Sequence, residues 1–124
     1  MKLICRHTSG PLPTSSFDLV GEAGEVIGFA QVRHRPSCNA DLPPAAGNNI
    51  YYEIAKAHRG CGHGKTLMTL VLAEAKRIGL QKVRLTCKDD DPVSRHIMES
   101  HGAVLVGDFI CARGERYHLL EISP

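Results

Sequence analysis

Apolar and polar residues alternate in several short stretches of the chain, which is the pattern of strands with one buried face. Residues 17–22 and 26–35 are two such stretches separated by a glycine-containing turn, so they are expected to form a hairpin. Further strands are expected at residues 50–55, 82–87, 103–112 and 116–122, the last two forming a second hairpin.

The clearest helical period lies at residues 65–79. Apolar residues recur there at three-four spacing, and the expected buried face consists of Leu67, Leu70, Val71 and Ile78. Lys76 and Arg77 favour the C-terminal end of this helix, and Gly79 is expected to stop it. A shorter helix is expected at residues 93–101, with the Asp89–Asp91 run and Pro92 as its cap.

The predicted element order is therefore β-β-β-α-β-α-β-β. A strand–helix–strand unit in the middle implies one parallel pair, whereas the hairpins imply antiparallel neighbours. The expected fold class is α/β (α+β), with a mixed and mostly antiparallel sheet. One domain is expected over residues 1–124, with an irregular N-terminus at residues 1–16, a recognisable core at residues 17–124, and a long irregular connection at residues 36–49.

The composition is that of an ordinary globular domain. The chain has 124 residues, of which 43% are hydrophobic and 23% charged, and its formal net charge is +2. This charge is too small to argue for a nucleic acid or a membrane surface as a partner. No apolar run approaches the roughly 18–20 residues of a membrane span. The N-terminus does not resemble a secretory signal, so a cytoplasmic protein is expected.

Cysteine and histidine residues do not predict a metal site. The five cysteines include no Cys-x-x-Cys pair, and reduced thiols are the expected state. His58 and His63 flank Cys61, but no third and fourth ligand follows at a recognisable spacing.

The segment HRGCGHGKT, residues 58–66, has the composition of a phosphate-binding loop. A P-loop requires glycine five positions before the Gly64-Lys65-Thr66 sequence, and Arg59 stands there instead. A glycine-rich turn that only begins a helix would also account for these residues. The remaining parsing is Arg59-x-x-Gly62-x-Gly64, placed between an expected strand and a long amphipathic helix.

This second parsing resembles the signature loop of the GNAT superfamily, the Gcn5-related N-acetyltransferases. The resemblance extends from about residue 17 to the C-terminus, through IYYEIAKAHRGCGHG and LTCKDDDPVSRHIMESHGAVL. The latter sequence is similar to a small bacterial branch of predicted acetyltransferases. In place of the family's usual Asn-x-x-Ser and Gly-Phe, this chain has Asp91 with Ser94 and Gly102 with Ala103.

The resemblance implies that acetyl-CoA binds in a cleft where the strands at residues 50–55 and 82–87 splay apart. Ile54 would then pair with the pantetheine arm, and Asp91 would take the position of the family's asparagine. A helix N-terminus binds phosphate through unpaired N–H groups, and glycines let the backbone come close. The residues implied for the pyrophosphate are Arg59, Gly60, Cys61, Gly62, His63, Gly64 and Lys65.

The residues for proton transfer are less well marked. The family's tyrosine acid corresponds to Met98, which has no proton to donate, and the nearest replacements are Ser94 and Cys87. Glu53 is the candidate base, although an ordinary solvent-facing strand carboxylate would look the same. Weaker candidates for the base are His34, Tyr52 and His101.

The family usually opens with a strand and two helices that wall the acceptor site, and only 16 residues precede Phe17 here. The chain is therefore expected to lack these elements. The acceptor could be large, a second subunit could complete the wall in a homodimer, or the domain could bind CoA without turnover. The resemblance implies acetyl transfer from acetyl-CoA to a small-molecule or peptide amine, with no metal. The alternatives are a CoA-binding interaction module and, more remotely, a nucleotide binder.

Overall fold

The elements follow the order expected from the sequence pattern, with one additional strand at the N-terminus. The structure is a computed structural model, and it describes residues 1–9, 14–37 and 48–124. The strands are β1 Lys2–Ser9, β2 Thr14–Val20, β3 Val26–Ser37, β4 Asn48–Ile54, β5 Val83–Lys88, β6 Val104–Ile110 and β7 Arg116–Ile122. The helices are α1 His63–Ile78 and α2 Pro92–Ser100, and a short 3-10 turn, η2, covers Lys56–His58.

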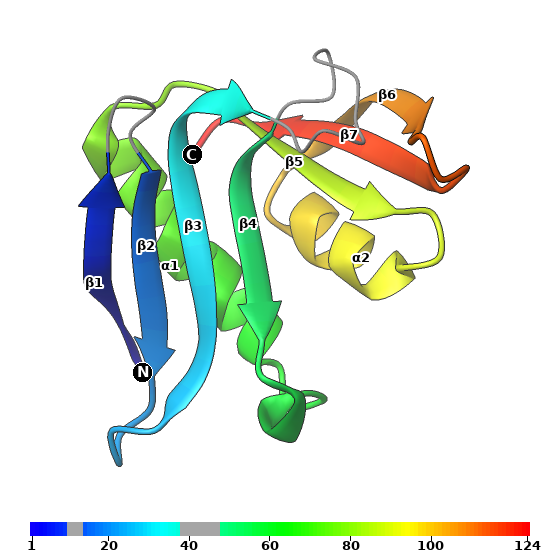
Figure 1. Ribbon diagram of the computed structural model, residues 1–124. Coiled ribbons are helices and arrows are strands. Elements are labelled where there is room, and N and C mark those ends of the chain that lie inside the picture. The colour runs from blue at the N-terminus through cyan, green and yellow to red at the C-terminus, as the bar shows by residue number, and fades with distance from the viewer. Residues whose placement is uncertain (10–13, 38–47) are drawn as a thin grey trace.

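The described strands form two antiparallel sheets, one in the order β1-β2-β3-β4 and the other in the order β5-β7-β6. Helix α1 lies across one face of the first sheet, and α2 contacts both α1 and β5 (Figure 1). The α/β class and the mostly antiparallel pairing are those expected from the sequence. In the described ranges, no helix is both long and apolar enough to cross a bilayer.

The core lies between α1 and the first sheet. Along β2, Phe17 and Leu19 point into it, whereas Asp18 between them faces out and pairs with Arg6. The buried face of α1 consists of Leu67, Met68, Val71, Leu72 and Ala75. It is rotated slightly from the expected one, because Leu70 and Ile78 lie at its margins and are only partly buried.

Strands β4 and β5 form a fork. The predicted strand–helix–strand unit is present, but its two strands belong to different sheets and share no hydrogen-bonded ladder. Side chains join them near the start of β4: the Asn48 amide donates to the Thr86 hydroxyl at 2.9 Å, and the Arg84 backbone N–H donates to Asn49 Oδ1 at 2.9 Å. Beyond these contacts the strands diverge, which Figure 1 shows clearly.

The expectation of an irregular N-terminus at residues 1–16 is wrong. Residues 2–9 form β1, which pairs antiparallel with β2 from Lys2 opposite Val20 to Ser9 opposite Thr14. A strand therefore precedes β2, where the sequence led us to expect none. A β-bulge between Cys5 and His7 interrupts the two-residue period, and Pro11 and Pro13 made the segment look like a loop. Residues 10–13, between β1 and β2, lie outside the described residues.

The irregular connection expected at residues 36–49 is shorter than predicted at both ends. Residues 36 and 37 extend β3, and Asn48 and Asn49 begin β4. The rest of that prediction, residues 38–47, lies outside the described residues.

Candidate functional site

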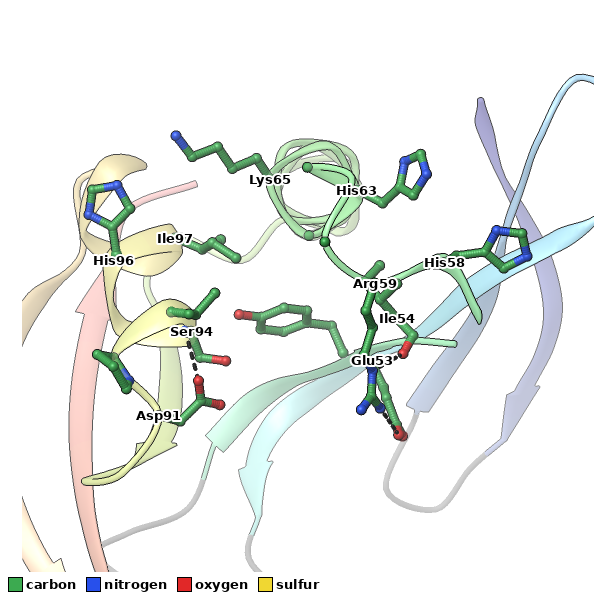
Figure 2. Close-up of a pocket in the computed structure, with 16 residues that line it drawn as sticks. Glu53, Ile54, His58, Arg59, His63, Lys65, Asp91, Ser94, His96 and Ile97 are labelled. Carbon is green, nitrogen blue, oxygen red and sulfur yellow. Dashed lines mark hydrogen bonds and ion pairs between the residues drawn. The ribbon is translucent and has the colours of Figure 1, made fainter. Parts of the chain in front are cut away.

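A cavity of about 750 Å³ opens in the fork, on the side where α1 and α2 begin. Below we call it the fork cavity. Four segments meet around it: the end of β4, the glycine loop, the first turn of α1 and the first turn of α2 (Figure 2). Its lining residues are Tyr52, Glu53, Ile54, His58, Arg59, Gly60, Gly62, His63, Gly64, Lys65, Asp91, Pro92, Val93, Ser94, His96 and Ile97.

The first turn of α1 presents its backbone N–H groups to this cavity. Gly62 is the N-cap, with φ +79°, and no side chain makes a capping hydrogen bond there. A left-handed φ of this size suits glycine far better than other residues. The first N–H groups of a helix have no partner within it, and together with the helix dipole they favour an anion. This end of α1 can therefore bind phosphate through its backbone.

Arg59 ties the loop to the end of β4. Its Nε donates to the Ile54 carbonyl at 2.9 Å, and its Nη2 lies 3.2 Å from Glu53 Oε1. Both contacts lie on the opposite side of β4 from Lys65 and Ile97 (Figure 2). In this arrangement the guanidinium holds the loop in place, and its contribution to anion binding is indirect.

Basic and imidazole side chains surround the mouth of the fork cavity. Lys65 lies in the first turn of α1, and His96 projects from α2 toward the same opening (Figure 2). His58 and His63 contact each other edge to face, with ring centroids 6.4 Å apart. A cation and three imidazoles around an open helix N-terminus suit a ligand that carries several phosphate charges.

The N-terminus of α2 has the opposite character. Asp91 is its N-cap, and Asp91 Oδ1 accepts a hydrogen bond from the Ser94 backbone N–H at 3.1 Å, with Pro92 at the start of the helix. The cap predicted from the sequence is confirmed. A carboxylate already occupies this helix end and repels phosphate, so the uncapped end of α1 is the better suited of the two to an anion.

Glu53 contributes to the wall, but its carboxylate is already engaged. It accepts a hydrogen bond from the Tyr51 hydroxyl at 3.1 Å and forms the ion pair with Arg59. Figure 2 shows this carboxylate on the side of β4 away from Ser94 and Lys65. Alternation along the strand puts Tyr51 and Glu53 on one face and Tyr52 on the other.

A second cavity of about 360 Å³ lies on the other side of the fork. Its walls come from β3, β4, β5, β7 and α2, and include Tyr51, Thr86 and Lys88. Tyr52, Asp91 and Ser94 line both cavities, so the two spaces meet at these three residues.

Tyr52 occupies that junction with a buried hydroxyl. Among the described residues, its oxygen is the one buried side-chain N or O atom that has no hydrogen-bond partner. Burial raises the pKa of Tyr52 above its ordinary value, and the Ser94 hydroxyl nearby lowers it by less. A buried hydroxyl without a partner is costly and is characteristic of functional positions.

The fork cavity collects every candidate cofactor-binding residue except Cys61. The Cys61 side chain is exposed, and its Sγ lies 3.8 Å from the Arg59 carbonyl. The weaker base candidates His34 and His101 line neither of these two cavities. His34 forms a hydrogen bond with the Ser15 hydroxyl, and His101 forms one with the Thr69 hydroxyl.

Met98 stands at the position where the resemblance implies the family's tyrosine. Its side chain is buried against the core and reaches the second cavity without a hydroxyl. Cys87 also lines the second cavity, and burial raises the pKa of its thiol, which favours the unreactive protonated form. Sequence reasoning ranked Tyr52 low, because its orphaned hydroxyl depends on how α2 packs beside β4.

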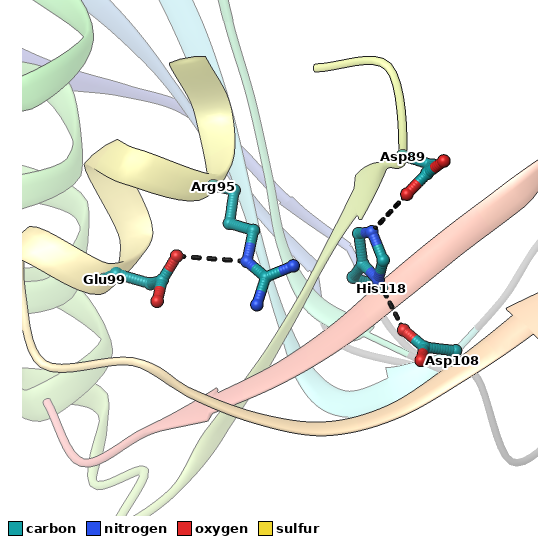
Figure 3. Close-up of polar contacts among 5 residues, drawn as sticks. All are labelled: Asp89, Arg95, Glu99, Asp108 and His118. Carbon is teal, nitrogen blue, oxygen red and sulfur yellow. Dashed lines mark hydrogen bonds and ion pairs between the residues drawn. The ribbon is translucent and has the colours of Figure 1, made fainter. Parts of the chain in front are cut away.

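A separate polar cluster supports the sheet of β5, β7 and β6. His118 on β7 bonds Asp108 through Nδ1 and Asp89 through Nε2, while Arg95 and Glu99 pair on the adjacent face of α2 (Figure 3). The hydrogen bond from His118 holds the pKa of Asp108 below its ordinary value. In the part of the chain that the structure describes, no group of three or more potential ligands could hold a metal ion.

Comparison with protein families agrees with this geometry. The model of the acetyltransferase (GNAT) family matches residues 6–103, which is most of the chain. No curated protein matches the sequence.

Three solved structures that share the fold are described as acetyltransferases. A spermidine N-acetyltransferase from Vibrio cholerae, in complex with CoA and spermine, is 21% identical, with a TM-score of 0.71 and coverage of 89% of this chain and 65% of that chain. A dodecameric form of the Vibrio cholerae enzyme is 20% identical with a TM-score of 0.70, covering 89% and 64%. A protein from Bordetella pertussis, described as a GNAT-family acetyltransferase, is 22% identical with a TM-score of 0.73, covering 89% and 66%. This chain therefore spans slightly less than two thirds of the length of each.

Proposed function

This chain belongs to the acetyltransferase (GNAT) family, and from that premise we propose that it binds acetyl-CoA in the fork cavity and transfers the acetyl group to an amine. The observation that carries the proposal is the uncapped N-terminus of α1, which opens into a cavity between two diverging strands. Such a helix end suits a pyrophosphate, and the fork cavity of about 750 Å³ has room for the pantetheine arm of CoA.

The glycine loop supplies the proposed phosphate contacts. Backbone N–H groups between Gly60 and Lys65 would bind the pyrophosphate, with Lys65 neutralising charge at the mouth and the neighbouring imidazoles placed to donate hydrogen bonds. Ile54, at the end of β4, would pair its backbone with the pantetheine arm. Asp91 would contact the neutral part of that arm, because its carboxylate repels phosphate.

Glu53 is the proposed general base. It lies on the face of β4 that also carries Tyr51, which lines the second cavity and donates a hydrogen bond to Glu53. A proton leaving an amine in the second cavity could therefore reach Glu53 through one hydroxyl or one water molecule. Glu53→Gln is expected to lower the rate of transfer and to leave CoA binding intact. Transfer at the wild-type rate would contradict the role.

The second cavity is the proposed entry side for the acceptor. Its volume of about 360 Å³ suits a small amine or one extended side chain. The Vibrio cholerae structure in complex with CoA and spermine makes polyamines the first acceptors to test. A lysine side chain or a peptide N-terminus would also present the required nucleophile.

A homodimer is proposed as the working form. The outer face of the first sheet carries exposed Ile4, Phe29 and Tyr51, and a second copy could cover this face and complete the acceptor wall. Light scattering is expected to give twice the monomer mass, and a monomeric mass at assay concentration would contradict it. Cys61, Cys87 and Cys111 are free thiols, which suits the reducing conditions of the proposed cytoplasmic location.

The test of the function is an acetyl-transfer assay. Purified protein is incubated with acetyl-CoA and with spermidine, spermine, free lysine or short peptides, and acetylated products are detected by mass spectrometry. At least one amine is expected to be acetylated faster than in protein-free controls. Binding of acetyl-CoA without any product would instead support a CoA-binding module, and a melting-temperature increase with Mg-ATP alone would support a nucleotide binder.

A further inference from the structure

We propose that the Tyr52 hydroxyl donates its proton to the departing CoA sulfur, in place of a donor from α2. The inference rests on the acetyl-transfer function proposed above and adds a residue to that reaction. It begins from the position of the hydroxyl, which lies buried where the fork cavity and the second cavity meet.

The location suits the reacting bond. A cofactor anchored at the N-terminus of α1 extends along the fork cavity toward the shared residues Tyr52, Asp91 and Ser94. An amine in the second cavity would approach the same three residues from the opposite side. The thioester and the amine can meet only where the two cavities join, and the Tyr52 side chain lines both of them.

The hydroxyl is also preorganised for a ligand. Within the described part of the chain it has no hydrogen-bond partner, although its oxygen is buried. An unsatisfied buried O–H costs free energy, and that cost is removed when a ligand atom accepts the hydrogen bond. The Ser94 hydroxyl lies near enough to lower the pKa of Tyr52, but the distance and angle between the two groups do not make a hydrogen bond, so the Tyr52 O–H remains available to a third group.

The protonation state fits a donor. Burial raises the pKa of Tyr52, and the Asp91 carboxylate raises it further, while Ser94 acts in the opposite direction. Tyr52 therefore keeps its proton at neutral pH. Two other groups in the second cavity fit the role less well: Met98 carries no proton, and the Cys87 thiol lines the second cavity but not the fork cavity.

The proposed step balances without another reactant. The amine nitrogen bonds to the thioester carbonyl carbon, the C–S bond breaks with its electron pair moving to sulfur, and the Tyr52 proton passes to that sulfur as it leaves. The products are an amide, the CoA thiol and a tyrosine phenolate. The proton released by the amine then returns to the phenolate through water.

A binding experiment can test the donor without knowledge of the acceptor. If Tyr52 donates to the sulfur, it also stabilises the thiolate of bound CoA, and the pKa of that thiol is lowered by about one unit. The thiolate is titrated by its ultraviolet absorbance in protein saturated with CoA. The same titration with a CoA analogue that lacks the sulfur is subtracted, which removes the signal of the protein's own cysteines.

The key variant is Tyr52→Phe, which keeps the ring and removes only the hydroxyl. We expect CoA to bind within about threefold of its wild-type affinity while the thiol pKa returns to its value in solution. With an acceptor from the amine screen, kcat is expected to fall about 100-fold at nearly constant KM. The melting temperature should stay equal or rise, because an unsatisfied buried hydroxyl has been removed.

Two matched variants separate this role from its rivals. Tyr51→Phe removes a hydroxyl from the opposite face of β4 and should leave the thiol pKa unchanged. Ser94→Ala tests the neighbouring hydroxyl. A thiol pKa that responds to Ser94→Ala and not to Tyr52→Phe overturns the inference and assigns the proton to Ser94. A wild-type protein whose bound CoA thiol titrates as it does in solution overturns the inference alone, and failure to bind CoA overturns the proposed function with it.

Discussion

The two cavities of the fork are built in different ways. The mouth of the fork cavity is formed mainly by backbone, namely two glycines with left-handed φ and the uncapped N-terminus of α1. The second cavity is formed by side chains from five elements, and these are held by hydrogen bonds between residues distant in the sequence. The first is a local structure suited to phosphate, whereas the second requires the whole fold to be assembled.

The difference explains how far the sequence alone could lead. Gly62 and Gly64 lie within a few residues of each other and next to a strongly periodic helix, so the loop and the start of α1 were predictable from local pattern. The family resemblance then extended that prediction to a fold, which the family match and the structure confirm, and to a cofactor, which stays a proposal.

The features that escaped prediction depend on packing between distant segments. Asn49 looked like part of an irregular connection, yet it is buried and links β3, β4 and β5. Tyr52 and Glu53 are neighbours in the sequence but face opposite sides of β4. The packing of α2 beside β4 decides that the Tyr52 hydroxyl is buried without a hydrogen-bond partner, and the sequence does not show this packing. Strand β1 was missed because a bulge breaks its period and because edge pairing leaves little mark on composition.

The largest expected effect comes from opening the fork at its base. Asn49 donates to the Arg33 carbonyl at 3.0 Å and accepts from the Arg84 N–H at 2.9 Å. Asn49→Ala leaves both backbone groups without this partner and is expected to lower the free energy of unfolding by about 3 kcal/mol. Urea denaturation measures the change.

A matched variant calibrates that effect. Thr86→Val removes only the hydroxyl that accepts from Asn48, so a loss of about 1 kcal/mol is expected. If Asn49→Ala cost no more than Thr86→Val, the side chain of Asn49 would not be the link between the sheets.

An intermediate effect, on acetyl-CoA affinity, is expected at Arg59, whose side chain fixes the glycine loop to the end of β4. Arg59→Lys keeps the positive charge but cannot contact both the Ile54 carbonyl and Glu53 with the same geometry. The loop is then less firmly held, and acetyl-CoA affinity is expected to fall about tenfold, or roughly 1.4 kcal/mol, in a calorimetric titration. Arg77→Lys alters an ion pair with Glu74 on α1, away from the cavity, and serves as the control. Equal affinities of the two variants would refute the tethering role.

The smallest expected effect is a pH dependence of the melting temperature that comes from the His118–Asp108 contact in the sheet of β5, β7 and β6. The hydrogen bond from His118 lowers the pKa of Asp108 below its ordinary value of 3.8. A carboxyl with a lowered pKa in the folded state adds stability above that ordinary value, and the contribution is lost as pH falls through the lowered pKa. The wild-type protein is therefore expected to melt slightly above Asp108→Asn at neutral pH, and the difference should shrink below about pH 3.8.

The control for this prediction is Asp90→Asn, which removes one charge from an exposed position nearby. The difference in melting temperature between Asp90→Asn and wild type should stay nearly constant with pH. A difference between Asp108→Asn and wild type that persists unchanged into the acid range would contradict the role of the His118 contact.

The measurement that tests the central claim most directly is calorimetric titration of acetyl-CoA into wild type, Gly62→Val and Gly79→Val. Both glycines have left-handed φ values, +79° before α1 and +102° after it, and a valine is strained equally at either. We expect the two variants to lose similar stability. Wild type and Gly79→Val should bind acetyl-CoA with a dissociation constant on the order of micromolar. Gly62→Val should bind at least about 100-fold more weakly, because only the helix end at Gly62 faces the cavity. Equal affinity in the two variants, or no binding by wild type, would contradict the claim that the N-terminus of α1 holds the cofactor.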